Sequence, residues 1–407
     1  MARKAEPRSR WCGCALACVL SVALASSVRA SDWPHWRGPK WTGISEEKGW
    51  LTTWPQGGPK KLWTVRVGSG FSSVAVADGR VYTMGNTGNT DTVWCLKAET
   101  GEVVWKHSYP CPGEFGGYPG PRATPTVDGN RVYTMSGAGH LLCLDAKSGD
   151  VIWAKSTMTD LKGRTPGAWW GFSCSPFIDG DLLIVPVGPT VALKKATGEI
   201  VWSSGDYKAS YATAYAFDFN GQRLVAVFNA FGLVVVAETD GKEIGKLAWQ
   251  TSYDVNAVTP IVSGDKIFIS SGYGVGCALV QITAEGLKVV WRNRDMKNHF
   301  NSCVLWDGHL YGMDENQLRC MEFETGAVKW SERSTGKGSL IIADGKIIAM
   351  SDSGDLIVAE AVPTGFKPLA RAKVLGGLCW TTPALANGLV YCRNREGDLA
   401  CVDLRAR

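Results

Sequence analysis

The sequence predicts an all-β fold: an eight-bladed β-propeller with four-stranded antiparallel blades, closed by the N-terminal strand. Three observations lead to this prediction. A tryptophan recurs every 39–49 residues, a hairpin turn recurs eight times, and one strand near the N-terminus has no blade of its own. A period of about 40–50 residues is typical of propeller blades, because one such unit cannot bury its apolar face and must stack on its neighbours.

Each tryptophan of the repeat follows an apolar strand and a tight turn, as in LLCLDAKSGDVIWAKS at residues 141–156. Six tryptophans share this placement, at positions 105, 153, 202, 249, 291 and 330, and Trp63 in LWTVRV precedes them at the front of the series. Because they recur along the chain, we interpret them as structural. Each is expected to dock between neighbouring blades, with a glycine forming the tight turn beneath it.

A second repeated element is an alternating strand interrupted by a turn, as in VAVADGRVYTMG and ALANGLVYCRN. The Asp-Gly or Asn-Gly core of most copies is a strong hairpin signal, because the turn needs positive φ. Eight copies predict eight blades. Strands A and B flank this turn, strand C leads to the second turn, and strand D carries the tryptophan.

The two ends of the chain are expected to share a blade. The last repeat stops at GDLACVDLR without a D strand, whereas residues 61–67 form a D strand without a blade. Completing blade eight with this strand closes the ring and removes two exposed sheet edges. We therefore assign 61–407 to one propeller. Residues 31–60 form an irregular tryptophan-rich strap that fills grooves against it, with a carbohydrate-stacking surface as the alternative.

Residues 1–30 have the features of a secretory signal peptide. Basic residues precede an apolar run from Trp11 to about Ala25, and Val28-Arg29-Ala30 fits a cleavage site. The remainder has 38 basic and 37 acidic residues without a basic stripe, which argues against nucleic acid as a partner. With no later stretch long enough to span a bilayer, we expect a periplasmic or secreted monomer without a transmembrane segment.

Cysteine and histidine provide no metal or redox motif. Ten cysteines follow the signal peptide, and four of them (Cys95, Cys143, Cys320 and Cys401) share one strand-C position, which indicates small buried apolar residues. The absence of CxxC, CxxCH and HExxH leaves zinc, dithiol and c-type haem chemistry without support. We predict no metal site and leave disulfide pairing open, since an oxidising compartment permits it.

Candidate ligand-binding residues lie in the connections from strand D to the next strand A. All these connections emerge on one face of a propeller, so residues just before each A strand converge on the channel mouth. The candidates are Arg122, Trp169, Trp170, Asn256, His299, Asn301, Lys337 and Trp380. Aromatic planes, amides and two cations suit an anionic or polyhydroxylated ligand. The alternative is that they only plug the pore, and no catalytic residue is assigned.

The pattern Ala-x-(Ser/Thr)-Gly-x-x-x-Trp, as in 98–105 and 146–153, resembles the tryptophan-docking repeat of pyrroloquinoline-quinone (PQQ) propellers. The resemblance covers essentially the whole mature chain. That family includes quinoprotein alcohol dehydrogenases, which hold PQQ and calcium in the channel. It also includes cofactor-free relatives, such as the propeller lipoprotein of the outer-membrane β-barrel assembly machinery. The opening DWPHWRGP and the closing LCWTTPALANGLVYCRN are similar to a group of secreted bacterial PQQ-like repeat proteins.

The chain departs from the dehydrogenases in ways that bear on function. It lacks the adjacent Cys-Cys pair that stacks on the quinone, and no local match places their calcium ligands or catalytic Asp. The resemblance therefore implies a non-catalytic binding or scaffold module for a protein or saccharide, without a cofactor. The alternative is a PQQ- and calcium-dependent oxidoreductase that acts on an alcohol or sugar.

Overall fold

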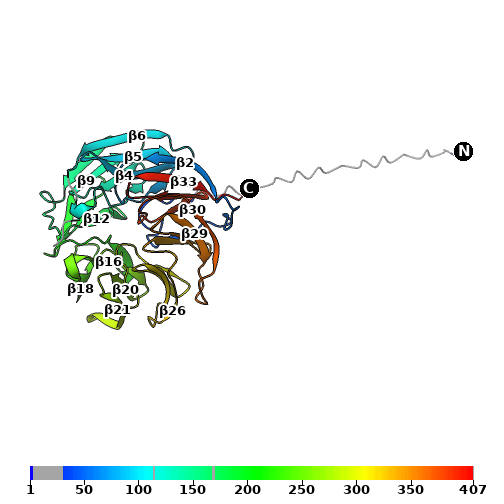
Figure 1. Cartoon of the computed structure of the whole chain (residues 1–407). Coiled ribbons are helices and arrows are strands. Elements are labelled where there is room, and N and C mark those ends of the chain that lie inside the picture. The colour runs from blue at the N-terminus through cyan, green and yellow to red at the C-terminus, as the bar shows by residue number, and fades with distance from the viewer. Residues whose placement is uncertain (3–30, 113–114, 167–169, 407) are drawn as a thin grey trace. The chain divides into compact units, whose positions relative to one another are not determined.

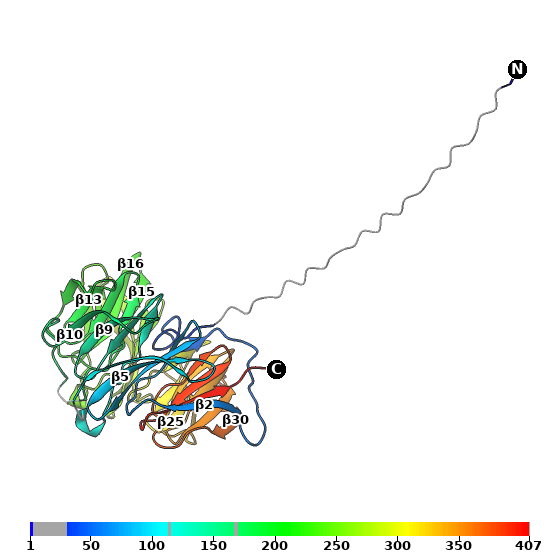
Figure 2. The same ribbon diagram turned by 90° about the horizontal axis from the view of Figure 1, so that it is seen from above.

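The repeated hairpins form a ring of eight antiparallel sheets in a computed structural model that describes residues 1–2, 31–112, 115–166 and 170–406 (Figures 1 and 2). This confirms the predicted eight-bladed propeller. The innermost strands of successive blades contact one another, for example β3 with β7 and β7 with β11, and they surround the central channel. Most of the predicted signal peptide (residues 3–30) lies outside the described residues. No helix among the described residues has the length and apolar character needed to cross a bilayer.

Blades one to four follow one another along the chain, each listed from its innermost to its outermost strand. They are β3 (Ala75–Ala77), β4 (Arg80–Thr87), β5 (Thr90–Lys97) and β6 (Val103–Pro110); β7 (Thr126–Asp128), β8 (Arg131–Met135), β9 (His140–Asp145) and β10 (Val151–Ser156); β11 (Phe177–Asp179), β12 (Leu182–Pro186), β13 (Thr190–Lys194) and β14 (Ile200–Ser204); β15 (Tyr215–Phe219), β16 (Gln222–Phe228), β17 (Gly232–Ala237) and β18 (Glu243–Ala248).

Blades five to eight complete the ring. They are β19 (Ile261–Ser263), β20 (Lys266–Ser271), β21 (Gly276–Thr283) and β22 (Gly286–Asn293); β23 (Val304–Trp306), β24 (His309–Asp314), β25 (Gln317–Glu322) and β26 (Val328–Glu332); β27 (Ser339–Ala343), β28 (Lys346–Met350), β29 (Asp355–Glu360) and β30 (Pro368–Lys373); β31 (Ala384–Ala386), β32 (Leu389–Arg393), β33 (Asp398–Asp403) and the N-terminal β2 (Lys60–Arg66). The short strand β1 (Ile44–Ser45) extends blade seven, and two 3-10 helices, η1 (Phe115–Gly117) and η2 (Ser252–Asp254), lie in connections.

Six of the seven repeat tryptophans dock as predicted. The indole nitrogen of each donates a hydrogen bond of 2.8–3.1 Å to a carbonyl oxygen of the next blade, and the six are Trp63, Trp105, Trp153, Trp202, Trp291 and Trp330. A turn glycine of the next blade lies beneath five of these rings, all except that of Trp330. At Gly149, where φ is +79°, a Cβ would lie 2.6 Å from the ring of Trp105.

Trp249 packs against the next blade as predicted, but it does not hold the repeat position. Strand register places Gly245 at the position in blade four that Trp202 holds in blade three. Trp249 lies beyond the end of β18 and donates to Ser271 Oγ at 3.1 Å. The physical reason is the neighbouring blade, where β21 and β22 are joined by a tight turn that offers no seat for an indole. Gly245 instead lets the next blade approach closely, since a Cβ there would lie 3.2 Å from Leu287.

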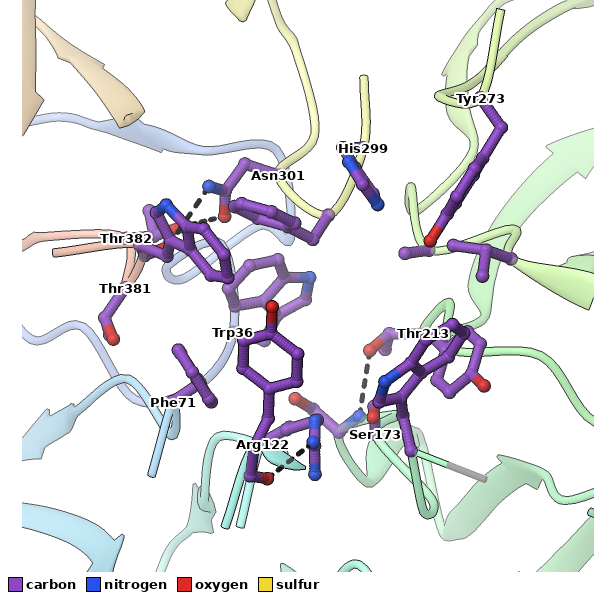
Figure 3. Close-up of a pocket in the computed structure, with 18 residues that line it drawn as sticks. Trp36, Phe71, Arg122, Ser173, Thr213, Tyr273, His299, Asn301, Thr381 and Thr382 are labelled. Atoms are coloured by element: carbon purple, nitrogen blue, oxygen red, sulfur yellow. Dashed lines mark hydrogen bonds between the residues drawn. The ribbon is translucent and has the colours of Figure 1, made fainter. Parts of the chain in front are cut away.

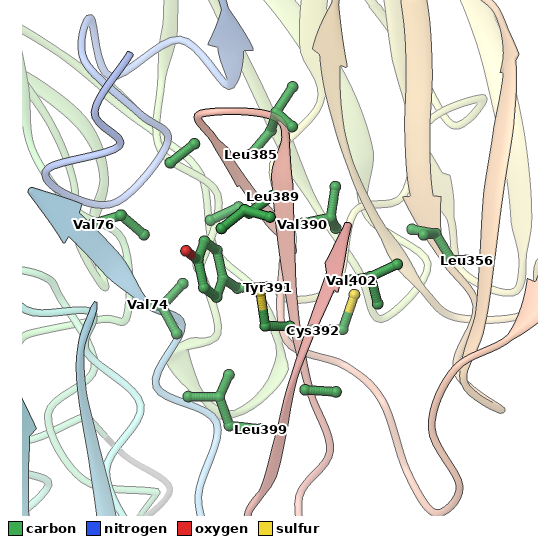
Figure 4. Close-up of a cluster of buried hydrophobic side chains, with 14 of the residues drawn as sticks. Val74, Val76, Leu356, Leu385, Leu389, Val390, Tyr391, Cys392, Leu399 and Val402 are labelled. Atoms are coloured by element: carbon green, nitrogen blue, oxygen red, sulfur yellow. The ribbon is translucent and has the colours of Figure 1, made fainter. Parts of the chain in front are cut away.

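The ends of the chain meet in blade eight, as predicted. Strand β2 pairs antiparallel with β33, and Figure 1 shows this blue strand beside the red one. A buried apolar cluster continues across this seam and includes Val76, Leu356 and Tyr391 from three blades (Figure 4). The fully buried Arg393 also crosses the seam, donating to the carbonyl oxygens of Ser72, Met84 and Gly68 at 2.8, 2.5 and 2.9 Å.

The first part of the tryptophan-rich segment, residues 31–45, enters the channel, whereas Trp50 and Leu51 contact Arg405 and Leu404 near the C-terminus. Trp33 forms a bridge with Val76 of β3, and the carbonyl oxygen of Pro34 accepts from Val127 of β7. The buried guanidinium of Arg37 donates to the carbonyl oxygen of Cys303 at 2.9 Å, and β1 pairs in parallel with β27. Since these partners belong to inner strands around the ring, the segment closes the channel from the A–B turn face.

Of the described residues, ten cysteines are free thiols, and all ten are buried. Burial raises the pKa of several of them, Cys95 and Cys320 to about 11. Thiols buried in this way are unreactive. The shared strand-C position therefore serves packing, as its repetition indicated.

Candidate functional site

A pocket of about 250 Å³ opens at the channel mouth, on the face where the D-to-A connections emerge. Its described lining comes from seven of these connections, from the loop between β20 and β21, and from the part of the tryptophan-rich segment that enters the channel (residues 31–45), which we call the channel segment. Figure 3 shows Trp36 near the middle, with Phe71, Arg122, Tyr273 and His299 around it. The converging connections bring together residues more than 300 positions apart in the sequence.

The predicted site residues do not all reach this pocket. Five line it: Arg122, Trp170, His299, Asn301 and Trp380. Lys337 lies behind the wall, with its Nζ 2.9 Å from His299 Nδ1. Asn256 is fully buried beneath the surface. Trp169 falls outside the described residues.

Aromatic rings form a nearly continuous chain around the mouth. Neighbouring ring centroids lie 4.7–6.2 Å apart along the series Tyr211, Trp170, Tyr253, Tyr273, His299, Phe300, Trp380, Phe71 and Tyr118. We call this set the aromatic collar. Such separations are typical of favourable aromatic pairs, which add stabilisation beyond burial alone. The collar therefore forms a wall that is both apolar and mutually supported.

Trp36 gives the pocket its floor. Its indole nitrogen donates to Thr259 Oγ1 at 3.0 Å, and its neighbours Trp33 and Arg37 are held by inner strands. At Gly38, φ is +73° and a Cβ would lie 2.5 Å from the ring of Trp33, so only glycine fits this bend. The motif DWPHWRGP thus builds a rigid plug that ends the pocket inside the channel.

Behind the part of the pocket wall that His299 forms, the positive charge of Lys337 is neutralised by the carboxylate of Glu315. Glu315 lies 3.0 Å from Lys337 Nζ and 3.7 Å from His299 Nδ1. Hydrogen bonds from His299 and Lys337 lower the pKa of Glu315 to about 2, so it is ionised at neutral pH. Lys337 and Glu315 therefore cancel each other, and this side of the pocket carries little net charge.

Arg122 differs because the described residues place no carboxylate in a salt bridge with it. Its guanidinium donates to the carbonyl oxygens of Tyr118 and Gly120 at 2.8 and 3.3 Å, and lies 5.9 Å from the ring centroid of Phe71. Burial lowers its pKa to about 10, which leaves it charged at neutral pH. Arg122 gives the mouth a positive charge that the collar does not neutralise.

The two predicted amides serve the fold. Asn301 donates from Nδ2 to the carbonyl oxygens of Gly338 and Trp380, and its Oδ1 accepts from Thr382. Asn256 donates to two carbonyl oxygens and accepts from Ser271. The side-chain amides of both residues are hydrogen-bonded to neighbouring protein groups and hold the connections in place. Neither amide is therefore free to bind a ligand.

Sequence reasoning missed most of the collar. Phe71, Tyr118, Tyr211 and Phe300 all lie in D-to-A connections, and counting every aromatic residue there would have found them. Tyr273 lies between β20 and β21, and B-to-C loops emerge on the same face by topology. Trp36 gave no such signal, because the strap lies outside the repeat.

The lining does not fit the cofactor pair of the quinoproteins. Calcium takes six to eight oxygen ligands, usually including carboxylates. No Asp or Glu belongs to the described lining, and the nearby Glu315 is paired with Lys337 at 3.0 Å. Within the described parts of the chain, no three His, Cys, Asp or Glu side chains are grouped to hold a metal ion. The pocket is also smaller than the roughly 300–1,000 Å³ of typical cofactor sites.

Comparison with known proteins gives the family. The family described as outer membrane protein assembly factor BamB matches residues 47–168 and 114–332. The Yersinia pestis protein named outer membrane protein assembly factor BamB is 26% identical over 369 residues, covering 85% of this chain and 78% of its own length.

Two solved structures show the shared fold. BamB from Moraxella catarrhalis has a TM-score of 0.60 at 14% identity, covering 86% of this chain and 98% of its own. The quinohemoprotein alcohol dehydrogenase ADHIIG from Pseudomonas putida has a TM-score of 0.63 at 13% identity, covering 93% of this chain and 81% of its own. The sequence match spans more than half of the chain, and this protein therefore belongs to the BamB family of PQQ-like β-propellers.

Proposed function

We propose that this protein is a non-catalytic binding scaffold of the cell envelope, which holds a protein partner at the mouth of its central channel. The observation that carries this proposal is the aromatic collar around a pocket that opens at the channel mouth. Binding hot spots in protein interfaces are enriched in Trp, Tyr and Arg and cluster in well-packed pockets. The mouth has this composition, and the connections that present it are held by a rigid ring.

The chemistry of the pocket favours binding over catalysis. A nucleophile needs a base within hydrogen-bond reach. In the described lining, His299 is bonded to Lys337 and lies near Glu315, and no hydrogen bond joins it to a serine, threonine or cysteine. Its side chain therefore completes an ion-pair cluster and is not arranged as a general base.

A protein partner is supported better than a saccharide. Sugar recognition needs planar hydrogen-bonding groups beside the stacking rings, and both candidate amides are already used by the fold. Apolar side chains of a protein need only the rings and the space between them. The collar supplies both.

The cell envelope follows from two supports. The family is described as an outer membrane protein assembly factor, and the Yersinia pestis relative carries the same name. The N-terminal segment has the composition of an export signal. We propose that the partner is a component or client of outer-membrane protein assembly.

Site-specific photocrosslinking in cells tests this function. A benzoylphenylalanine replaces Tyr253, which is 61% exposed in the collar, and a matched control replaces Val201, which is 43% exposed on β14 at the outer rim. We expect envelope proteins to be captured from position 253 and not from position 201. Capture from the rim alone, or from neither position, contradicts the proposal.

A further inference from the structure

The collar and Arg122 together define what kind of group the pocket can take, and this inference rests on the proposed binding function. We infer that the pocket binds an aromatic ring that carries, or directly adjoins, a carboxylate. The shape of the pocket, the balance of its charges and its size each favour such a ligand.

The shape selects a ring. The collar surrounds the pocket on most sides, and Phe300 and Trp380 lie 4.7 Å apart at one wall. Trp36 lies at the bottom of the described lining, and the pocket opens at the channel mouth (Figure 3). Stacked and edge-on contacts from several directions favour a flat apolar group over a flexible chain, because a ring loses little conformational freedom on binding.

The charges select an anion. The charges of Lys337 and Glu315 neutralise each other across 3.0 Å. The guanidinium of Arg122 instead donates to a backbone carbonyl oxygen and lies over the ring of Phe71. This carbonyl oxygen is that of Tyr118, the last ring of the collar. A guanidinium held in an apolar surround gains strongly from a carboxylate, since charge-assisted hydrogen bonds are about twice as strong as neutral ones.

The size limits the ligand to one ring. About 250 Å³ accommodates a single side chain with a small polar substituent, whereas drug-sized ligands and cofactors occupy roughly 300–1,000 Å³. A three-ring quinone therefore fits less well than a phenyl or indole group beside one carboxylate. The same chemistry is available from a free small acid or from a partner polypeptide.

A matched pair of probes tests the inference on the full-length mature protein by calorimetry. N-acetyl-L-phenylalanine and N-acetyl-L-phenylalaninamide share the ring and differ in the carboxylate. We expect the acid to bind at least about tenfold more tightly than the amide. In Arg122→Gln the acid should fall to the affinity of the amide, and Arg122→Lys should restore part of the difference.

Several controls keep the result clear. Arg122 also holds the loop at 115–120, so binding of the amide reports whether the pocket itself survives in each variant. Arg66→Gln removes an exposed arginine on β2, where the carboxylate of Asp398 is 3.8 Å away, and should leave both affinities unchanged. Equal binding of acid and amide overturns the inference. So does a preference for the acid that persists in Arg122→Gln, or tighter binding of N-acetylglucosamine or PQQ than of the acid.

The outcome is separable from that of the proposed function. If the acid binds through Arg122 and the crosslinker at position 253 captures no protein, the ligand is a free aromatic acid and the scaffold proposal fails. If proteins are captured and the acid does not bind, the scaffold proposal stands and the ligand chemistry inferred here is wrong.

Discussion

Replacing Arg393 with methionine should destabilise the seam between blades eight and one. The buried guanidinium donates to three carbonyl oxygens of blade one and its preceding connection, those of Gly68, Ser72 and Met84, at 2.5–2.9 Å. Each buried carbonyl left without its donor costs about 1–3 kcal/mol. The variant regains the desolvation penalty of the guanidinium, which amounts to several kcal/mol. We expect a net loss of about 2–4 kcal/mol in the free energy of unfolding.

Urea unfolding followed by tryptophan fluorescence measures this loss. Arg80→Met is a matched control, because Arg80 also donates to a carbonyl of the next blade, that of Ala146 at 2.8 Å, but is partly exposed. We expect the control to lose about 1 kcal/mol or less. Hydrogen exchange should quicken first in β2 and β33 of blade eight, because Gly68, which Arg393 holds, closely follows β2. Equal losses for the two variants would refute the role assigned to Arg393.

Three further predictions follow from the same packing. Burial lowers the pKa of His35 to about 4, so the free energy of unfolding should fall as the pH drops from 6.5 towards 4. In His35→Phe the free energy of unfolding should depend less on pH. If urea titrations of the variant show the same pH dependence as the parent protein, this role of His35 is wrong. Trp153→Ala should lower the free energy of unfolding by about 3–5 kcal/mol and Trp36→Ala by less, so equal melting temperatures contradict the distinction between core and channel segment. Deleting residues 60–66 should expose the edge of β33 and cause aggregation, and a monomer with unchanged melting argues against closure by β2.

The fold was predictable because its signals repeat. Asp78-Gly79 and Asn387-Gly388 both adopt the positive φ angles that their hairpin turns require, with values of 50–70°. The six docked tryptophans follow from the same logic. Trp249 shows the limit of the spacing rule. It lies four residues after Gly245, which holds the repeat position, and spacing alone does not reveal this offset. Only strand register reveals it.

The candidate site was predictable in place and only partly in membership. Topology alone brings the D-to-A connections to the channel mouth, so Arg122, His299 and Trp380 could be named. Whether a polar side chain faces the pocket or the fold depends on its local partners. The side-chain amide of Asn256 donates to two backbone carbonyl oxygens and accepts from a serine hydroxyl. Nothing in the sequence around Asn256 indicates these hydrogen bonds.

The pocket is lined by residues that do not follow the repeat of the ring. The docked tryptophans and turn glycines recur and hold the blades together. The collar does not repeat in this way, because His299 and Phe300 share one connection and Tyr273 comes from a B-to-C loop. The tryptophan-rich segment departs furthest from the repeat, because it occurs once in the chain and supplies a single pocket residue, Trp36. Since Arg37 fixes the same segment to Cys303, the floor of the pocket is tied to the inner strands. Ligand affinity at the mouth therefore depends on the N-terminal segment as well as on the blades.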